Sequence, residues 1–172
     1  RIFNKQIRAG GKIFGFEMKC WHLKRIGVDS EQAMCFLQRQ KYKKHIILER
    51  KNNLRVLVST HVARATAKWH LKVGEKPVSG KIKLQKVSFQ SLRSFDQYFA
   101  EIKMPLPENC LKITYEDDIF QDPKIAYKKI ADYLGLKPRD VEVRYQRTCP
   151  EALPDLLLNF GEVRDTLLGT EY

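Results

Sequence analysis

A basic turn between an apolar run and an amphipathic segment has the residue types of an anion-binding site. The apolar run 45–48 leads directly into Arg50 and Lys51, and helical spacing of apolar residues begins just beyond. The N-terminus of a helix carries partial positive charge and unbonded N–H groups, and an Arg or Lys adds a full charge beside them. Ser59 lies within about 20° of Asn52 on the helix surface, given the ~3.6-residue period. The turn therefore predicts a phosphate site, with Asn52 mainly a helix cap.

The segments that would position this turn alternate between strand-like and helix-like patterns. The sequence predicts strands over 13–19, 45–49 and 110–115. It predicts helices over 31–39, 53–68, 88–101, 122–135 and 154–168. Such alternation indicates an α/β fold in which helices cover both faces of a parallel sheet. Ligands of open α/β sheets bind beyond the carboxyl ends of the strands, which is where the basic turn lies.

Local signals mark several of the predicted ends. Ser30 is a suitable N-cap for the helix over 31–39, with Phe36 among the residues on its apolar side. Pro123 suits the first position of a helix, and Gly135 suits its C-terminal cap. The stretch 72–86 holds glycine and proline between short alternating pieces, which is typical of a loop or loose hairpin.

Composition limits the class of protein. The chain has 172 residues, 43% of them hydrophobic and 30% charged, which suits one domain with a real core. Its net charge of +12 favours anionic partners, whether nucleic acid, a nucleotide cofactor, an acidic glycan or an anionic lipid surface. No apolar run approaches the ~18 residues needed to span a bilayer.

The four cysteines do not form a recognisable metal or redox motif. Cys20, Cys35, Cys110 and Cys149 are widely spaced, and no CxxC or zinc-type Cys/His spacing is present. We expect free, mostly buried thiols in a reducing compartment. The even count leaves open disulfides in a lumenal or secreted setting.

Three segments in order resemble the bacterial glycolipid and nodulation-factor type of sulfotransferase, which uses 3′-phosphoadenosine-5′-phosphosulfate (PAPS). They are ERKNNLRVLVS with ARATAKWH, ITYEDDIFQDPKIAYKKIADYLGL, and QRTCPEALPDLLLNFGEVRDTLLGTEY. The resemblance implies a P-loop-like three-layer α/β/α fold with a parallel sheet, forming a single domain over 1–172. It also implies PAPS as sulfuryl donor, no metal, and an acceptor hydroxyl on a carbohydrate, glycolipid or other small molecule.

The resemblance also implies roles for particular residues. The family places one basic side chain eight positions before the serine, which here is Lys51 before Ser59. Arg50 is adjacent and is the better bidentate phosphate ligand. Arg147 lies where related enzymes bring a second basic contact to the 3′-phosphate. Each also has an ordinary interpretation, as a solvated basic residue or, for Ser59, as a small packing residue. The Tyr-Glu-Asp run at 115–117 is expected to be architectural.

One part of the family pattern is missing. Related enzymes have an N-terminal strand-loop-helix, rich in Gly, Ser and Thr, that wraps the 5′-phosphosulfate. The Gly-rich stretch 9–12 leads into a predicted strand instead, which is the wrong order for such a loop. The sequence is therefore expected to be an N-terminally incomplete domain.

The chemical step needs a base for the acceptor hydroxyl and a cation for the developing charge. The family commonly carries a lysine and a histidine two residues apart on the strand that corresponds to 13–20. Here those positions hold Glu17 and Lys19, with His22 nearby. We expect Glu17 to act as base and Lys19 to steady the charge, whereas an ordinary salt-bridged strand end is the alternative.

Two further interpretations remain open. The net charge also suits a basic domain that binds nucleic acid or another polyanion, although no aromatic-basic motif of the RNP type is present. A third keeps the fold and an adenosine 3′,5′-bisphosphate site without activity. The expected location is cytoplasmic, or a Golgi-type lumen if an N-terminal anchor was removed.

Overall fold

The computed structural model describes residues 13–77, 80–85, 92–94, 96–97, 100 and 106–170. By its internal contacts the chain forms two compact units, Arg1–Lys41 and Tyr42–Tyr172. No helix within the described ranges is long and apolar enough to cross a membrane.

The first unit holds two helices, α2 (Cys20–Arg25) and α3 (Ser30–Arg39). The predicted strand over 13–19 is wrong, because the described residues place no strand alongside it and a strand requires a partner. Asp29, not Ser30, caps α3: its carboxylate accepts from the Gln32 N–H at 2.7 Å, and the Gln32 side chain accepts from the Asp29 N–H at 3.3 Å. This reciprocal pair is a capping box.

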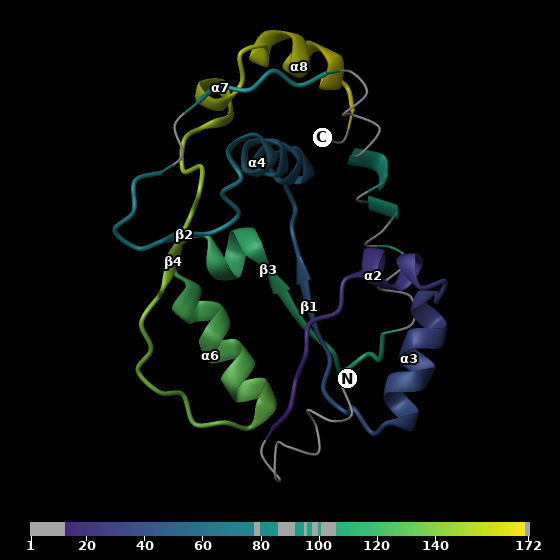
Figure 1. Cartoon of the computed structure of the whole chain (residues 1–172). Coiled ribbons are helices and arrows are strands. Elements are labelled where there is room, and N and C mark those ends of the chain that lie inside the picture. Colours follow the sequence, from purple (N-terminus) through teal and green to yellow (C-terminus); the bar gives the residue numbers. More distant parts are fainter. Residues whose placement is uncertain are drawn as a thin grey trace. The chain divides into compact units, whose positions relative to one another are not determined.

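The second unit contains a small parallel sheet of two strands, β1 (Ile46–Glu49) and β3 (Leu111–Thr114). Its register runs from the pair Ile46 and Leu111 to the pair Glu49 and Thr114. The crossover between the strands begins with α4 (Asn53–Thr66), which follows β1 directly (Figure 1). The mixed α/β class and the parallel pairing of these two strands are therefore as predicted.

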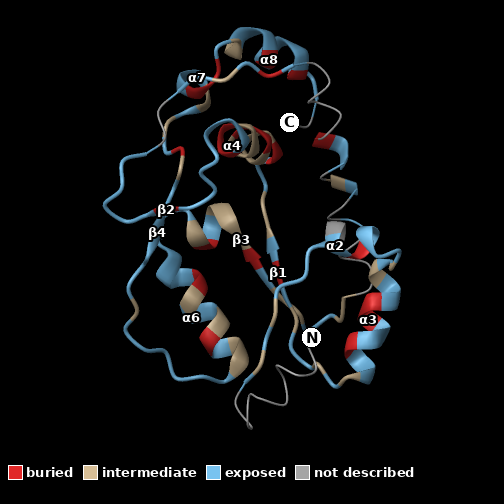
Figure 2. Cartoon of the chain, viewed as in Figure 1, coloured by how far each residue is buried: buried red, intermediate tan, exposed pale blue. Residues whose placement is uncertain are grey.

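Each strand is buried on one face only. Ile47 and Ile113 are buried, whereas Leu48 is 55% exposed, an alternation that Figure 2 shows along the sheet. Paired residues share a face, and Ile113 pairs with Leu48, so Ile47 and Ile113 are buried on opposite faces. On the β3 side the sheet is in contact with α6 (Pro123–Leu134).

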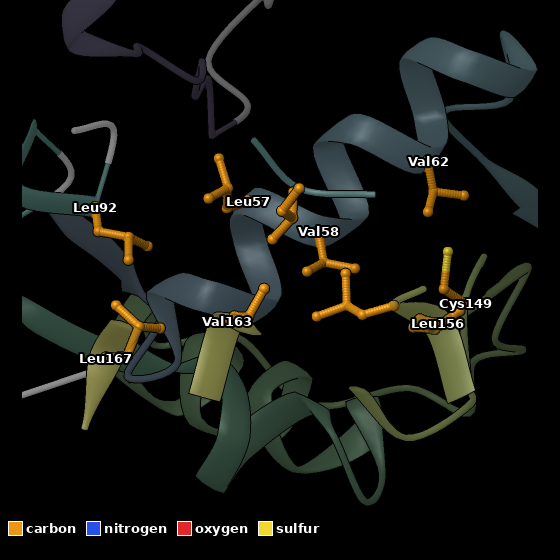
Figure 3. Packing of buried hydrophobic residues seen from close by; sticks show 10 residues of the cluster. Leu57, Val58, Val62, Leu92, Cys149, Leu156, Val163 and Leu167 are labelled. Atoms are coloured by element: carbon orange, nitrogen blue, oxygen red, sulfur yellow. The ribbon is translucent and has the colours of Figure 1, made fainter. Parts of the chain in front are cut away.

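The main core of this unit lies between α4 and the C-terminal segment. Val58 and Val62 of α4 point toward the C-terminal segment with α7 (Leu153–Leu156) and α8 (Phe160–Leu167), as Figure 3 shows, and Leu57 belongs to the same buried cluster. The cluster also takes in residues from outside these helices: Leu84, Leu92, Cys149 and Leu157. The predicted helix over 88–101 falls largely outside the described residues.

The C-terminal helix predicted over 154–168 is broken into α7 and α8. Leu157 leaves the helix to form a parallel bridge with Ile82. The Asn159 side chain then binds both backbone groups of Leu84, accepting from its N–H at 3.1 Å and donating to its carbonyl at 2.9 Å. The segment that contains Ile82 therefore supplies backbone partners that a continuous helix would exclude.

Of the two interpretations of 72–86, a loop and a loose hairpin, the described residues agree with the loop and not with the hairpin. The strand β2 (Leu71–Lys72) pairs antiparallel with β4 (Tyr145–Gln146), which is far along the chain. Leu71 is fully buried and anchors this ribbon. The ends of α6 follow the prediction, with Pro123 in its first turn and Gly135 as a left-handed C-cap at φ 71°.

Candidate functional site

The turns that follow β1 and β3 lie at the same edge of the parallel sheet, because Glu49 pairs with Thr114. After β3 the chain forms a π-helical turn, η2 (Tyr115–Ile119). Single π-helical turns occur often at functional sites. This arrangement brings the Tyr-Glu-Asp run of η2 against the basic turn that was predicted to bind an anion.

Glu116 occupies part of the predicted anion site. Its carboxylate accepts from the Lys51 N–H at 2.9 Å and from the Asn52 N–H at 3.3 Å. The expectation that these N–H groups stand open to a ligand is therefore corrected, because a carboxylate of the chain already takes them. The architectural interpretation of Glu116 is supported, although it caps the turn after β1 rather than its own following helix.

Asp117, which follows Glu116 in η2, forms an ion pair with Lys51. The ammonium of Lys51 lies 2.6 and 2.9 Å from the two carboxylate oxygens of Asp117. This hydrogen bond raises the pKa of the Lys51 side chain. Lys51 thus remains positively charged but has a carboxylate partner of its own.

Two arginines from distant parts of the chain lie over the faces of two adjoining rings. The Arg50 guanidinium carbon is 3.8 Å from the Tyr115 ring centroid, and that of Arg147 is 4.1 Å from the Phe120 centroid. The two rings meet edge to face at 6.4 Å between centroids. A cation over an aromatic face is held by the ring quadrupole. The hydrogen-bonding edges of both guanidiniums remain available to a ligand.

Arg55 joins these two residues from the first turn of α4. Its guanidinium donates to the carbonyl of Cys149, two residues beyond Arg147. Burial is the main cause that lowers the pKa of Arg55. The charges of Arg147 and Arg50 also lower this pKa, whereas Cys149 and Glu151 raise it. We refer to Arg50, Arg55 and Arg147 as the arginine cluster.

The arginine cluster has no acidic partner among the described residues. No carboxylate oxygen in these ranges lies within 4.0 Å of any of the three guanidiniums. Arg50 and Arg55 are half-buried, whereas Arg147 is exposed. Three arginines that lack an ion pair and lie near one another favour an oxyanion as ligand, because guanidinium–oxyanion hydrogen bonds are charge-assisted. Sequence reasoning missed Arg55, although its place three residues after the helix cap was a usable signal.

Asn52 and Ser59 both have hydrogen bonds within α4. The Asn52 side chain accepts from the Arg55 N–H at 2.8 Å and caps the helix, which confirms its predicted role. The Ser59 hydroxyl is half-buried and donates to the Val56 carbonyl at 3.0 Å. Ser59 can reach a ligand only by exchanging that bond, so its role in phosphate binding stays a prediction.

Asp118 fixes η2 to the end of β3 and to α6. It is a buried carboxylate that accepts from the Thr114 N–H at 2.7 Å and from the Lys129 ammonium at 2.5 Å. The bond from Lys129, followed by that from Thr114, lowers the pKa of Asp118. These contacts fix Tyr115 and Glu116 at the sheet edge through α6.

The two predicted catalytic residues belong to the first unit. Lys19 and Glu17 form an ion pair with 3.4 Å between nitrogen and oxygen, and their side chains are 48% and 76% exposed. They do not share a strand face, since 13–19 is not a strand. His22, the other candidate base, is exposed on α2.

A hollow of about 820 Å³ lies beside the β2–β4 ribbon, away from the predicted site residues. It is lined by Lys72, Val73, Lys124 and residues 140–145. In the described part of the chain no three His, Cys, Asp or Glu side chains gather as a metal site would require. Cys35, Cys110 and Cys149 are unpaired, and only Cys149 of these three is buried.

Comparisons of the chain with models of protein families, with curated proteins and with solved structures found no match.

Proposed function

We propose that this chain is a PAPS-dependent sulfotransferase domain that holds the 3′-phosphate of the donor at the arginine cluster. The observation that carries the proposal is that Arg50 and Arg147, from opposite halves of the sequence, lie over two adjoining rings, and neither forms an ion pair with a carboxylate of the described residues. The meeting point lies at the carboxyl edge of the parallel strands, where open α/β folds bind ligands.

The residues present fit a phosphomonoester. Arg50 and Arg147 are each held over an aromatic ring, and a guanidinium can bind a phosphate through two parallel N–H groups. Arg55 adds a third charge, and Ser59 has a hydroxyl in the following turns of α4. Lys51, paired with Asp117, contributes positive charge at longer range. Arg–phosphate bonds are charge-assisted and stronger than neutral ones.

We place the sheet in a P-loop-like three-layer α/β/α fold, as the resemblance implies. Two features support this placement: the parallel crossover from β1 through α4 to β3, and the burial of Ile47 and Ile113 on opposite faces. An antiparallel pairing of β1 and β3 would have excluded it.

In the proposed reaction PAPS supplies an activated sulfuryl group. The acceptor hydroxyl oxygen forms a bond to sulfur while the bond from sulfur to the phosphate oxygen breaks. The family resemblance assigns the proton-accepting role to Glu17 and the stabilisation of the leaving group's negative charge to Lys19, which both belong to the first unit. The products are a sulfate ester and adenosine 3′,5′-bisphosphate. The acceptor is a hydroxyl of a carbohydrate, a glycolipid or another small molecule.

Calorimetric titration of the chain with adenosine 3′,5′-bisphosphate tests the binding half of the proposal. We expect saturable one-to-one binding that adenosine 5′-monophosphate, which lacks the 3′-phosphate, reproduces at least tenfold more weakly. Transfer of labelled sulfuryl from PAPS to a panel of sugar and glycolipid acceptors tests the catalytic half. Binding without transfer would leave the domain as a non-catalytic adenosine 3′,5′-bisphosphate-binding module.

A second candidate, a domain that binds nucleic acid, is favoured by one observation. Arginines stacked on Tyr115 and Phe120 are also a feature of surfaces that bind single-stranded nucleic acid. Salt dependence separates the two, because binding through several phosphates weakens with a log–log slope of roughly −0.7 per contact on single strands. Micromolar affinity for single-stranded RNA, without any for the bisphosphate, would replace the first proposal by the second.

A further inference from the structure

Arg55 is the member of the arginine cluster to which the family resemblance assigns no role. It is half-buried at the start of α4, and its one hydrogen bond to Cys149 uses only part of a guanidinium with five N–H donors. Within the described residues its guanidinium forms no ion pair within 4.0 Å, although the charge of Glu151 acts on it at longer range. Its position next to Arg50 and Arg147 therefore adds a third positive charge to a site that two arginines could already form.

A third charge changes which anions the site prefers. Three cations held together repel one another, and the nearby charges of Arg50 and Arg147 do act on Arg55. A singly charged oxyanion offsets one of the three charges, whereas a doubly charged one offsets two. A phosphomonoester is doubly charged above its second pKa of about 6, whereas a sulfate monoester of the same shape carries a single charge.

We propose that Arg55 makes the arginine cluster selective for a doubly charged phosphomonoester over a singly charged oxyanion of the same shape. This inference rests on the proposed function, since it takes the cluster as the phosphate site. It goes beyond it by assigning charge-state selectivity to one residue. Such selectivity would separate the 3′-phosphate end of the donor from a sulfate ester product.

Phenyl phosphate and phenyl sulfate form a matched pair of probes for this selectivity. We expect the wild-type chain to bind phenyl phosphate at least tenfold more tightly at pH 7.5, by NMR or calorimetric titration at low salt. At pH 5.5, half a unit below the second pKa, about three quarters of the phenyl phosphate carries a single charge, so the preference should fall about three- to fourfold.

Protein groups that titrate near the site act on both probes. The groups facing Arg55 are Arg50, Arg147, the Cys149 thiol and Glu151. At the neighbouring turn lie Lys51, Glu116 and Asp117. Phenyl sulfate keeps its charge over this pH range, so a change in its affinity reports titration of these protein groups. Dividing the affinity for phenyl phosphate by that for phenyl sulfate cancels this contribution.

The variant Arg55→Gln should lower the preference at pH 7.5 to about threefold and flatten its pH dependence. Arg55→Lys, which keeps the charge, should restore both. Arg64→Gln, which removes an exposed arginine from the last turn of the same helix, is the matched control and should behave as wild type. Melting temperatures are measured alongside, and Arg55→Met, which keeps the aliphatic stem, replaces the glutamine variant if that variant does not fold.

The outcomes separate this inference from the proposed function. A folded neutral variant that keeps a tenfold, pH-dependent preference overturns the role of Arg55, and the proposed function stands if adenosine 3′,5′-bisphosphate still binds. If the wild-type chain binds neither phenyl phosphate nor the bisphosphate, both proposals fail.

Discussion

The guanidinium of Arg50 lies on the face of the Tyr115 ring, 3.8 Å from its centroid, and so joins the turn after β1 to the turn after β3. The two residues are held there by the parallel register that places Glu49 beside Thr114. Glu116, which follows Tyr115, accepts hydrogen bonds from the N–H groups of Lys51 and Asn52, the two residues after Arg50. The proposed phosphate site is thus built from two sheet-edge turns that depend on each other.

The arginines should matter more than the lysine in binding adenosine 3′,5′-bisphosphate. Arg50→Ala and Arg147→Ala should each weaken binding by about 10- to 100-fold, since a charge-assisted hydrogen bond contributes about 1.5–3 kcal/mol. Lys51→Ala should cost only a few-fold, because Asp117 already partners its ammonium. Calorimetry measures all three, with Lys81→Ala as an exposed control. A control that costs as much as the arginine variants would indicate diffuse surface charge.

The aromatic ring of Tyr115 should contribute to bisphosphate affinity by positioning Arg50, without contact to the ligand. Tyr115→Leu should weaken bisphosphate binding by about two- to fivefold, because a cation–π contact worth about 0.5–1 kcal/mol no longer holds the guanidinium in place. Tyr115→Phe keeps the ring face and should bind as wild type. Titration of both variants decides the matter: equal loss in the two would point to the hydroxyl instead of the ring.

Glu116 should stabilise the fold and oppose the ligand. Glu116→Ala leaves the N–H groups of Lys51 and Asn52 without their carboxylate partner, so the melting temperature should fall. The same change removes a negative charge and frees two donors, so affinity for inorganic phosphate should rise. Asp117→Asn is the comparison, since it removes a charge from Lys51 without opening the turn. A fall in both stability and phosphate affinity would show that the turn itself had collapsed.

Asp118 should make stability depend on pH in the acid range. Its pKa in the folded chain is lowered from the unfolded value of about 3.9. The stabilisation is therefore present above that value and is lost as the pH falls below about 4. Asp118→Asn should cost about 1.5 kcal/mol at pH 7, and in urea unfolding the gap from wild type should narrow as the pH falls below about 4. Asp140→Asn, at an exposed ion pair, should show no comparable gap.

The proposed chemical step gives the last prediction. With PAPS and an acceptor present, Glu17→Gln should lower turnover by about 10²-fold or more, the usual effect of losing a general base. Bisphosphate affinity should not change, because Glu17 is not part of the arginine cluster. Turnover within threefold of wild type would assign the base to another residue, with His22 the next to test.

Local sequence determined the features that depend on a few neighbouring residues. The start of α4 could be predicted because Asn52 caps it through a hydrogen bond with a residue three positions later. The end of α6 could be predicted because Gly135 adopts the left-handed conformation that ends a helix. The same reasoning placed the cap of α3 at Ser30, one residue after the observed cap Asp29, because both residue types cap helices well and the backbone geometry of the folded chain selects one. The position of the basic turn at the sheet edge could also be predicted, since ligands of open α/β sheets bind beyond the carboxyl ends of the strands.

Only the tertiary structure decided which distant segments meet. The stretch 13–19 has a strand pattern but no paired strand in the described residues, and the predicted last helix breaks where Leu157 pairs with Ile82. The arginine cluster has the same origin: Arg147 reaches Arg50 because β2–β4 pairing and the Phe120 ring bring it there. Caps act through bonds between near neighbours, whereas pairing and charge clustering depend on register and burial between segments far apart in sequence.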